Sequence, residues 1–124
     1  MLRKSLTMAA CFFAGVALVA FAQTQAEMNA ESATAYEKAD AELNKVYKEL
    51  RAKLSDDQKA KLKEVQLLWL KYRDKNAEFE AALYEGGSMA PMVYAGALTT
   101  ATEDRVETLK SMFAEGYPES SGDQ

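Results

Sequence analysis

The sequence contains no histidine and a single cysteine, Cys11. Without histidine the chain cannot build a Ser-His-Asp or Cys-His catalytic centre, a zinc finger or a His-containing di-iron bundle. One cysteine cannot form an internal disulfide, so no disulfide framework holds the fold. Carboxylate chemistry, or no chemistry at all, is what remains open.

The carboxylates show no pattern typical of acid–base catalysis. Asp56 and Asp57 are explained by the start of a helix, because acidic side chains suit the positive end of the helix dipole. Glu78 and Glu80 are two residues apart and would therefore lie on different faces of a helix. We expect a protein that is not an enzyme and that carries no cofactor and no metal ion.

The first 22 residues have the pattern of a secretory signal peptide. Arg3 and Lys4 precede an uncharged apolar run over residues 6–21, and residues 20–22 form a small-x-small ending. The run of about 16 residues is shorter than the roughly 20 that a membrane-spanning helix needs. Cys11 precedes most of this run, whereas a lipidated cysteine would follow it. We expect a periplasmic or secreted protein with no stable membrane anchor after cleavage.

Cleavage is predicted after Ala22, with Ala26 as the alternative site. Removing 22 of the 124 residues leaves 102, which is enough for one domain with a modest core. The loss of Arg3 and Lys4 leaves 13 basic against 19 acidic residues, a formal charge of −6. This charge disfavours nucleic acid and anionic lipid as partners and favours a basic protein.

Glycine and proline are absent for a long stretch after the leader, where the first glycine is Gly86 and the first proline is Pro91. Apolar residues in this stretch and beyond recur at three- and four-residue steps, which is typical of the buried face of a helix. The first row comprises Tyr36, Leu43, Val46, Tyr47, Leu50 and Leu54; the second Leu62, Val65, Gln66, Leu68, Trp69, Tyr72, Arg73, Asn76, Phe79 and Leu83; the third Leu98, Thr102, Arg105, Leu109, Met112 and Phe113.

Two sets of residues mark the breaks between these helices. Residues 55–58, Ser-Asp-Asp-Gln, are typical of a capping box, so the first helix is expected to end near Leu54. The second helix is expected to stop at Gly86-Gly87. Ser88 is the expected cap of the third helix, with Pro91 in its first turn, where a missing N–H is tolerated.

The third helix is expected to end at Gly116 and Pro118. Helices of this length joined by short turns must fold back on one another. We therefore predict an all-α, up-down-up antiparallel three-helix bundle over residues 23–115. The small, polar and acidic residues 116–124 are predicted to form a disordered tail.

Several polar residues interrupt the apolar rows, and a buried polar group needs a partner. Antiparallel partners should have numbers that sum to about 110 across the first turn and about 174 across the second. This register places Asp40, Trp69, Arg73, Thr102 and Arg105 in one layer and sets Asn44 opposite Gln66. Together with Asp74, these residues form the predicted polar layer. We expect Asp40 or Asp74 to pair with Arg73 or Arg105, and the Arg105 guanidinium to lie near the indole of Trp69. We interpret the polar layer as a clasp that fixes the register of the helices, rather than as a recognition site.

A second group of residues gathers at one end of the predicted bundle and carries few charges. Aromatic and methionine side chains on an exposed loop suit contact with a protein, and the alternative is that they cap the core. The candidate contact loop comprises Tyr84, Gly86, Gly87, Ser88, Met89, Met92 and Tyr94. Met89 and Met92 alone are weak support for a copper(I) site.

These motifs together resemble the LprI-like lysozyme-inhibitor family. The resemblance rests on Leu43-Asn44 with Tyr47, on Gln66-x-x-Trp69-x-x-x-Arg73-Asp74, on Gly86-Gly87-Ser88 and on Thr102-x-x-Arg105-x-x-x-Leu109, behind a signal peptide. It covers roughly residues 33–113. The resemblance implies a small exported helical domain and, for the namesake member, inhibition of lysozyme by binding.

The chain departs from the family at two positions where members commonly carry a bridging cysteine pair. Asn76 stands at one and about Ala97 at the other. Helices 2 and 3 must therefore be held by packing and by the polar layer. The leading hypothesis is a protein-binding module that inhibits a basic lysozyme. The alternative is a periplasmic interaction or chaperone-like envelope protein without effect on lysozyme, which predicts an exposed apolar groove.

Overall fold

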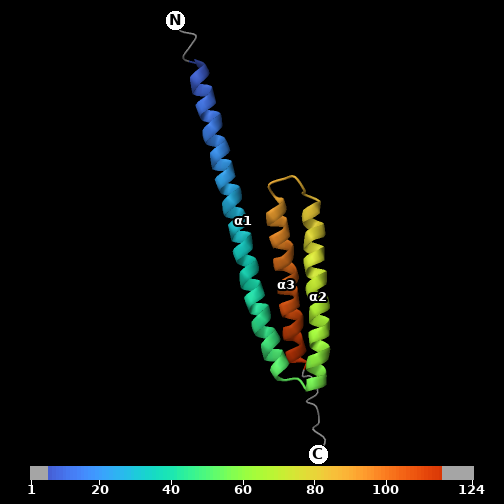
Figure 1. Cartoon of the computed structure of the whole chain (residues 1–124). Coiled ribbons are helices and arrows are strands. Elements are labelled where there is room, and N and C mark those ends of the chain that lie inside the picture. The colour runs from blue at the N-terminus through green and yellow to red at the C-terminus, as the bar shows by residue number, and fades with distance from the viewer. Residues whose placement is uncertain (1–5, 116–124) are drawn as a thin grey trace, which may run out of the picture.

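The computed structural model describes residues 6–115, with side chains from Thr24 onward. Three helices make up this part of the chain: α1 (Leu6–Ala52), α2 (Asp56–Ala82) and α3 (Ala90–Ala114). They run antiparallel in sequence order, and α1 continues far beyond the connection between α2 and α3 (Figure 1). The predicted all-α three-helix bundle is confirmed.

The turn between α1 and α2 follows the sequence closely. The Ser55 side chain accepts a hydrogen bond from the Gln58 N–H at 3.3 Å, and the Ser55 N–H donates to Oε1 of Gln58 at 2.9 Å. These are the two reciprocal bonds of a capping box. Helix α1 ends at Ala52, two residues before the predicted Leu54.

The connection between α2 and α3 differs from the prediction at both ends. Helix α2 ends at Ala82, and turns fill the chain up to Gly87, with Gly86 at a φ of +82°. Ser88 does not cap α3: the N-cap is Met89, which makes no side-chain cap bond, and its carbonyl accepts the N–H of Val93. The helix begins one residue later than predicted, so the Ser88 hydroxyl precedes the N-cap position from which it could accept a backbone N–H of the first turn. Pro91 does lie in the first turn.

The core lies between α1 and α3, near the turn that joins α1 to α2. Its buried members are Leu43, Val46, Leu50, Leu54, Val106 and Leu109, and the half-buried Tyr47, Leu62, Trp69, Met112 and Phe113 pack against it. Burial of each leucine-sized side chain contributes about 1.5–3 kcal/mol. The backbone of α3 lies close to both other helices, whereas α1 and α2 approach each other at fewer points and meet through side chains such as those of Asp40 and Arg73.

The predicted buried row of α2 is wrong for half of its members. Gln66, Arg73 and Ala77 are the buried residues of this helix. Five apolar residues of the row are more than half exposed, namely Val65, Leu68, Tyr72, Phe79 and Leu83. Because α2 packs mainly on a single neighbour, only a narrow strip of its surface is covered, and the wide apolar face seen in the sequence extends beyond it.

Two expectations concern the ends of the chain. The predicted leader lies in residues 1–5, which are outside the described part, and in the first half of α1; cleavage after Ala22 stays a prediction. The predicted tail, residues 116–124, lies outside the described residues. Among the residues whose side chains the structure describes, no helix is long and apolar enough to cross a membrane.

Candidate functional site

Arg73 is the centre of the polar layer. Its residue is 6% exposed, and its Nε donates a 2.9 Å hydrogen bond to Oδ1 of Asp74. Its Nη1 lies 3.5 Å from Oδ1 of Asp40 on α1 and donates to Oγ1 of Thr102 on α3 at 3.3 Å. Both predicted carboxylate partners, Asp40 and Asp74, thus contact the Arg73 guanidinium, and this group joins all three helices.

Aromatic rings line the same layer. The Trp69 ring centroid lies 5.3 Å from the Arg73 guanidinium carbon and 5.7 Å from that of Arg105. Tyr36 on α1 places its ring centroid 5.4 Å from the Arg73 carbon. Both distances to Trp69 are in the range of cation–π attraction, so the predicted contact of Arg105 with the indole is confirmed.

Burial raises the pKa of Tyr36 above its ordinary value of 10.0, while the positive charge of Arg73 opposes this rise. The carboxylates of Asp40 and Asp74 add to the rise, because a nearby negative charge disfavours the phenolate. Tyr36 was placed in the first apolar row by the sequence but not in the polar layer. Its spacing of four residues from Asp40 was the signal that could have placed it there.

Gln66 and Arg105 form a second link between α2 and α3. The Arg105 Nε donates a 2.9 Å hydrogen bond to Oε1 of Gln66, which is buried. Asn44 does not join the layer: it is exposed and lines a shallow cleft of about 280 Å³ that Asp40 and Gln66 also border. The other seven predicted members lie together. Arg73 engages both carboxylates of the layer and Arg105 is bonded to Gln66, which is the arrangement of a clasp rather than of an open binding site.

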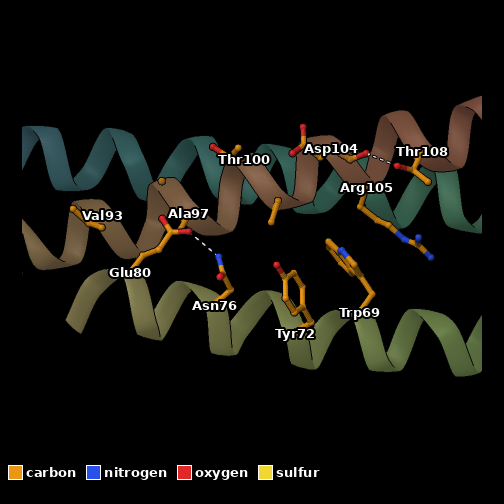
Figure 2. A pocket seen from close by; sticks show the side chains of 12 residues that line it. Trp69, Tyr72, Asn76, Glu80, Val93, Ala97, Thr100, Asp104, Arg105 and Thr108 are labelled. Atoms are coloured by element: carbon orange, nitrogen blue, oxygen red, sulfur yellow. Dashed lines mark hydrogen bonds between the residues drawn. The ribbon is translucent and has the colours of Figure 1, made fainter. Parts of the chain in front are cut away.

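A groove of about 660 Å³ runs between α2 and α3 (Figure 2). It is lined from α2 by Trp69, Tyr72, Asn76 and Glu80, and from α3 by Val93, Gly96, Ala97, Thr100, Ala101, Asp104, Arg105 and Thr108. Asn76 and Ala97, the two positions at which the resemblance implies cysteines, both line it. The Asn76 amide instead donates a 2.7 Å hydrogen bond to Glu80 on its own helix.

The candidate contact loop lies open at the α2–α3 end of the bundle. Tyr84, Met89 and Tyr94 are 47%, 45% and 37% exposed, while Met92 is half-buried. The glycines and Ser88 between them are exposed as well. More than a third of the surface of each of Tyr84, Met89 and Tyr94 is therefore open to a partner. In the described part of the chain, no cluster of carboxylates or other ligands could hold a metal ion.

Comparison with known proteins agrees with the motifs. The family model described as "Lysozyme inhibitor LprI" matches residues 20–109. An uncharacterised protein, R02472, of Rhizobium meliloti (strain 1021) is 33% identical over 104 residues, covering 73% of this chain and 75% of that protein. No solved structure matches the chain. The family match extends over the polar layer and the candidate contact loop, and the chain therefore belongs to the LprI lysozyme-inhibitor family.

Proposed function

We propose that this protein is an exported binding module that inhibits a lysozyme by binding it. Membership of the LprI family over residues 20–109 is the observation that carries the proposal. The acidic balance supports it, because cleavage after Ala22 would leave a formal charge of −6. A protein of this charge is steered toward a basic enzyme and associates faster at low salt.

The candidate contact loop is the surface that we propose for the lysozyme. Tyr84 and Met89 are nearly half exposed and stand on the turns between α2 and α3, where backbone and side chains are open to a partner. Large aromatic and methionine side chains bury much area on contact and are enriched at protein interfaces. Glu85 lies between them and adds negative charge suited to a basic surface.

The polar layer gives no support to catalysis. Asp40 and Asp74 are both engaged by Arg73, and Gln66 is engaged by Arg105. Among the described residues, Asp74 does not line the cleft that Asp40 borders, so these two carboxylates do not face one shared cavity as acid–base hydrolysis would need. We therefore propose that inhibition proceeds by occlusion and not by chemistry.

The test is a turbidity assay of cell-wall lysis with several lysozyme classes. The protein is expected to slow lysis by at least one class, and the double variant Tyr84→Ala with Met89→Ala is expected to weaken the effect about tenfold, as the loss of about 1.4 kcal/mol of binding would. Leu67→Ala, which truncates an exposed apolar side chain remote from the loop, is the matched control and should inhibit normally. Undisturbed lysis at large molar excess would retire the proposal.

Export is tested separately. Protein produced with its leader in a Gram-negative host should appear in the periplasmic fraction with Gln23 as its first residue, or with Glu27 if Ala26 is the site. Retention of Met1 on protein in the cytoplasm would contradict export.

The exposed apolar residues of α2 favour a second candidate, an envelope interaction protein without effect on lysozyme. Val65, Leu68 and Tyr72 provide the exposed apolar surface that this hypothesis predicts. A pull-down from envelope extract that repeatedly recovers one protein other than lysozyme would support it, provided that Leu68→Glu abolishes the recovery.

A further inference from the structure

Helix α2 carries a row of large apolar side chains that no other helix covers. The α2 row consists of Val65, Leu68, Tyr72, Phe79 and Leu83, which are between 51% and 70% exposed. Its steps of three, four and seven residues from Val65 to Phe79 are those of a coiled-coil seam, and Leu83, the C-cap, lies one residue past the next seam position. The buried residues Gln66, Arg73 and Ala77 mark a separate strip of the helix, the one that faces the bundle.

The size of the row matters more than its apolar character. Phenylalanine and tyrosine side chains can bury about 150–250 Å² each, so five large side chains exposed by more than half present roughly 600 Å² together. That is at the upper end of the largest apolar patch found on a monomer, about 300–600 Å². Two such rows packed on each other would remove about 1,200 Å² from water, the lower limit for a stable interface.

We propose that the α2 row is the interface of a homodimer, in which α2 packs antiparallel against α2 of a second copy about a two-fold axis. A row that is complementary to itself needs no second kind of surface, and a two-fold contact closes without forming fibres.

Among the antiparallel registers that the heptad spacing allows, one gives the greatest overlap of the two rows. Facing residues have numbers that sum to about 147 in the seam of such a pair. Leu68 then faces Phe79 of the second copy. Val65 faces Ala82, the last residue of α2 in the second copy, which is next to Leu83. Tyr72 faces Lys75, the charged residue that interrupts the row. Lys75 is 78% exposed and can lay its stem along the tyrosine ring with its ammonium in water.

The charges that flank the row fit the same register. Lys71 and Glu78 lie on one edge of the row, two turns apart, and antiparallel packing brings each opposite the other in the second copy. Glu78 now pairs with Lys75 of its own helix at 2.7 Å, in an exposed position where such a pair contributes little. The two-fold axis would create two Lys71–Glu78 pairs at once.

The neighbouring α3 surface leaves room for a second helix. Tyr72 lines the groove between α2 and α3 and extends from α2 toward α3, as Figure 2 shows. On the far side of this groove α3 presents mainly small side chains, including Gly96, Ala97 and Ala101. A helix approaching the α2 row therefore meets no bulky obstacle from α3.

Sedimentation analysis of the exported protein without lysozyme tests this proposal, from about 1 µM to about 200 µM, because a dimer forms by mass action. We expect a dimer in the upper part of this range. The double variant Leu68→Glu with Phe79→Glu should raise the dissociation constant at least about 100-fold, equivalent to about 2.7 kcal/mol. Leu67→Glu is the matched control, since Leu67 is 52% exposed on α2 but lies outside the row. It should leave the dimer intact.

A charge exchange tests the register. Lys71→Glu and Glu78→Lys should each weaken the dimer, and the two together should restore it, while far-UV circular dichroism stays that of the parent in all variants. A chain that stays monomeric at the highest concentration, as it would if a different protein occupied the row, overturns the proposal. So does a dimer that survives Leu68→Glu with Phe79→Glu. Because no lysozyme is present, neither result bears on the proposed inhibition.

Discussion

Thr102 of α3, which has no accessible surface, accepts a hydrogen bond from Nη1 of Arg73 on α2 over 3.3 Å. The same nitrogen lies 3.5 Å from Asp40 on α1. One guanidinium thus connects all three helices at a single height. We expect this contact to fix how the helices are aligned along their axes, which apolar packing alone leaves loosely specified.

Arg73→Ala is expected to lower the free energy of unfolding by about 2–3 kcal/mol. Removing one partner of a buried ion pair commonly costs about 3–5 kcal/mol, but Asp40 and Asp74 are 39% and 49% exposed and would be partly rehydrated. Arg73→Lys should recover only part of the loss, because an ammonium cannot bond both carboxylates and Thr102 in the same geometry. Urea unfolding measures both. Full stability of the lysine variant would argue against the clasp.

Gln66→Leu should destabilise the fold by about 1–3 kcal/mol, because it leaves the Arg105 Nε without its 2.9 Å acceptor in a buried place. Gln66→Glu keeps an acceptor oxygen and adds a charge opposite to that of Arg105, so it should be tolerated better. Thermal unfolding followed by circular dichroism compares the two. Equal losses would mean that side-chain shape, and not the hydrogen bond, decides the stability at this position.

Stability should fall as the pH rises above 10, and Tyr36 should account for part of the fall. Burial raises the folded-state pKa of Tyr36 above its unfolded value. At a pH between the unfolded-state and the folded-state pKa of Tyr36, the folded chain binds more protons than the unfolded chain. The contribution of Tyr36 to stability is therefore fully present below the unfolded-state pKa and is lost as the pH rises through the folded-state pKa. Tyr36→Phe should flatten this decline in urea unfolding between about pH 8 and pH 11. An unchanged slope would rule out the contribution.

Two glycines should respond to alanine in opposite ways. Gly86 has a φ of +82°, so Gly86→Ala should cost about 1–2 kcal/mol from backbone strain, although a Cβ there would meet no atom within 4 Å. Gly96 lies inside α3 with equally open space around it, so Gly96→Ala should stabilise the chain by about 0.5–1 kcal/mol. Thermal unfolding should show shifts of opposite sign, and two losses would contradict this account.

The polar layer could be predicted because it depends on chain geometry. The turn at Ser55 was marked by its capping box, and the second turn by Gly86 and Gly87. With both turns fixed, antiparallel helices can be aligned by counting, which placed Arg73 beside Asp40 and Thr102. Asn44 was the exception: its number fits the register, but it points to solvent.

The burial of α2 could not be predicted, because apolar residues show only that a face can be buried and not that a neighbour is there. Phe79 and Tyr72 belong to the same row in the sequence as Gln66 and Trp69, yet they lie outside the strip that α3 covers. The cap of α3 was also missed. Ser88 has the right chemistry, but the helix starts from Met89, and one residue of displacement removes the hydroxyl from the first turn.

The packing of α1 and α2 onto α3 affects when the chain can fold. Residues up to Gly87 contain two helices whose backbones come close at few points, so an incomplete chain lacks the surface on which both of them mainly pack. Only the synthesis of Ala90–Ala114 supplies it. For a chain that we propose to be exported, this order keeps the polypeptide open and able to thread through a translocation channel until nearly its whole length has been made.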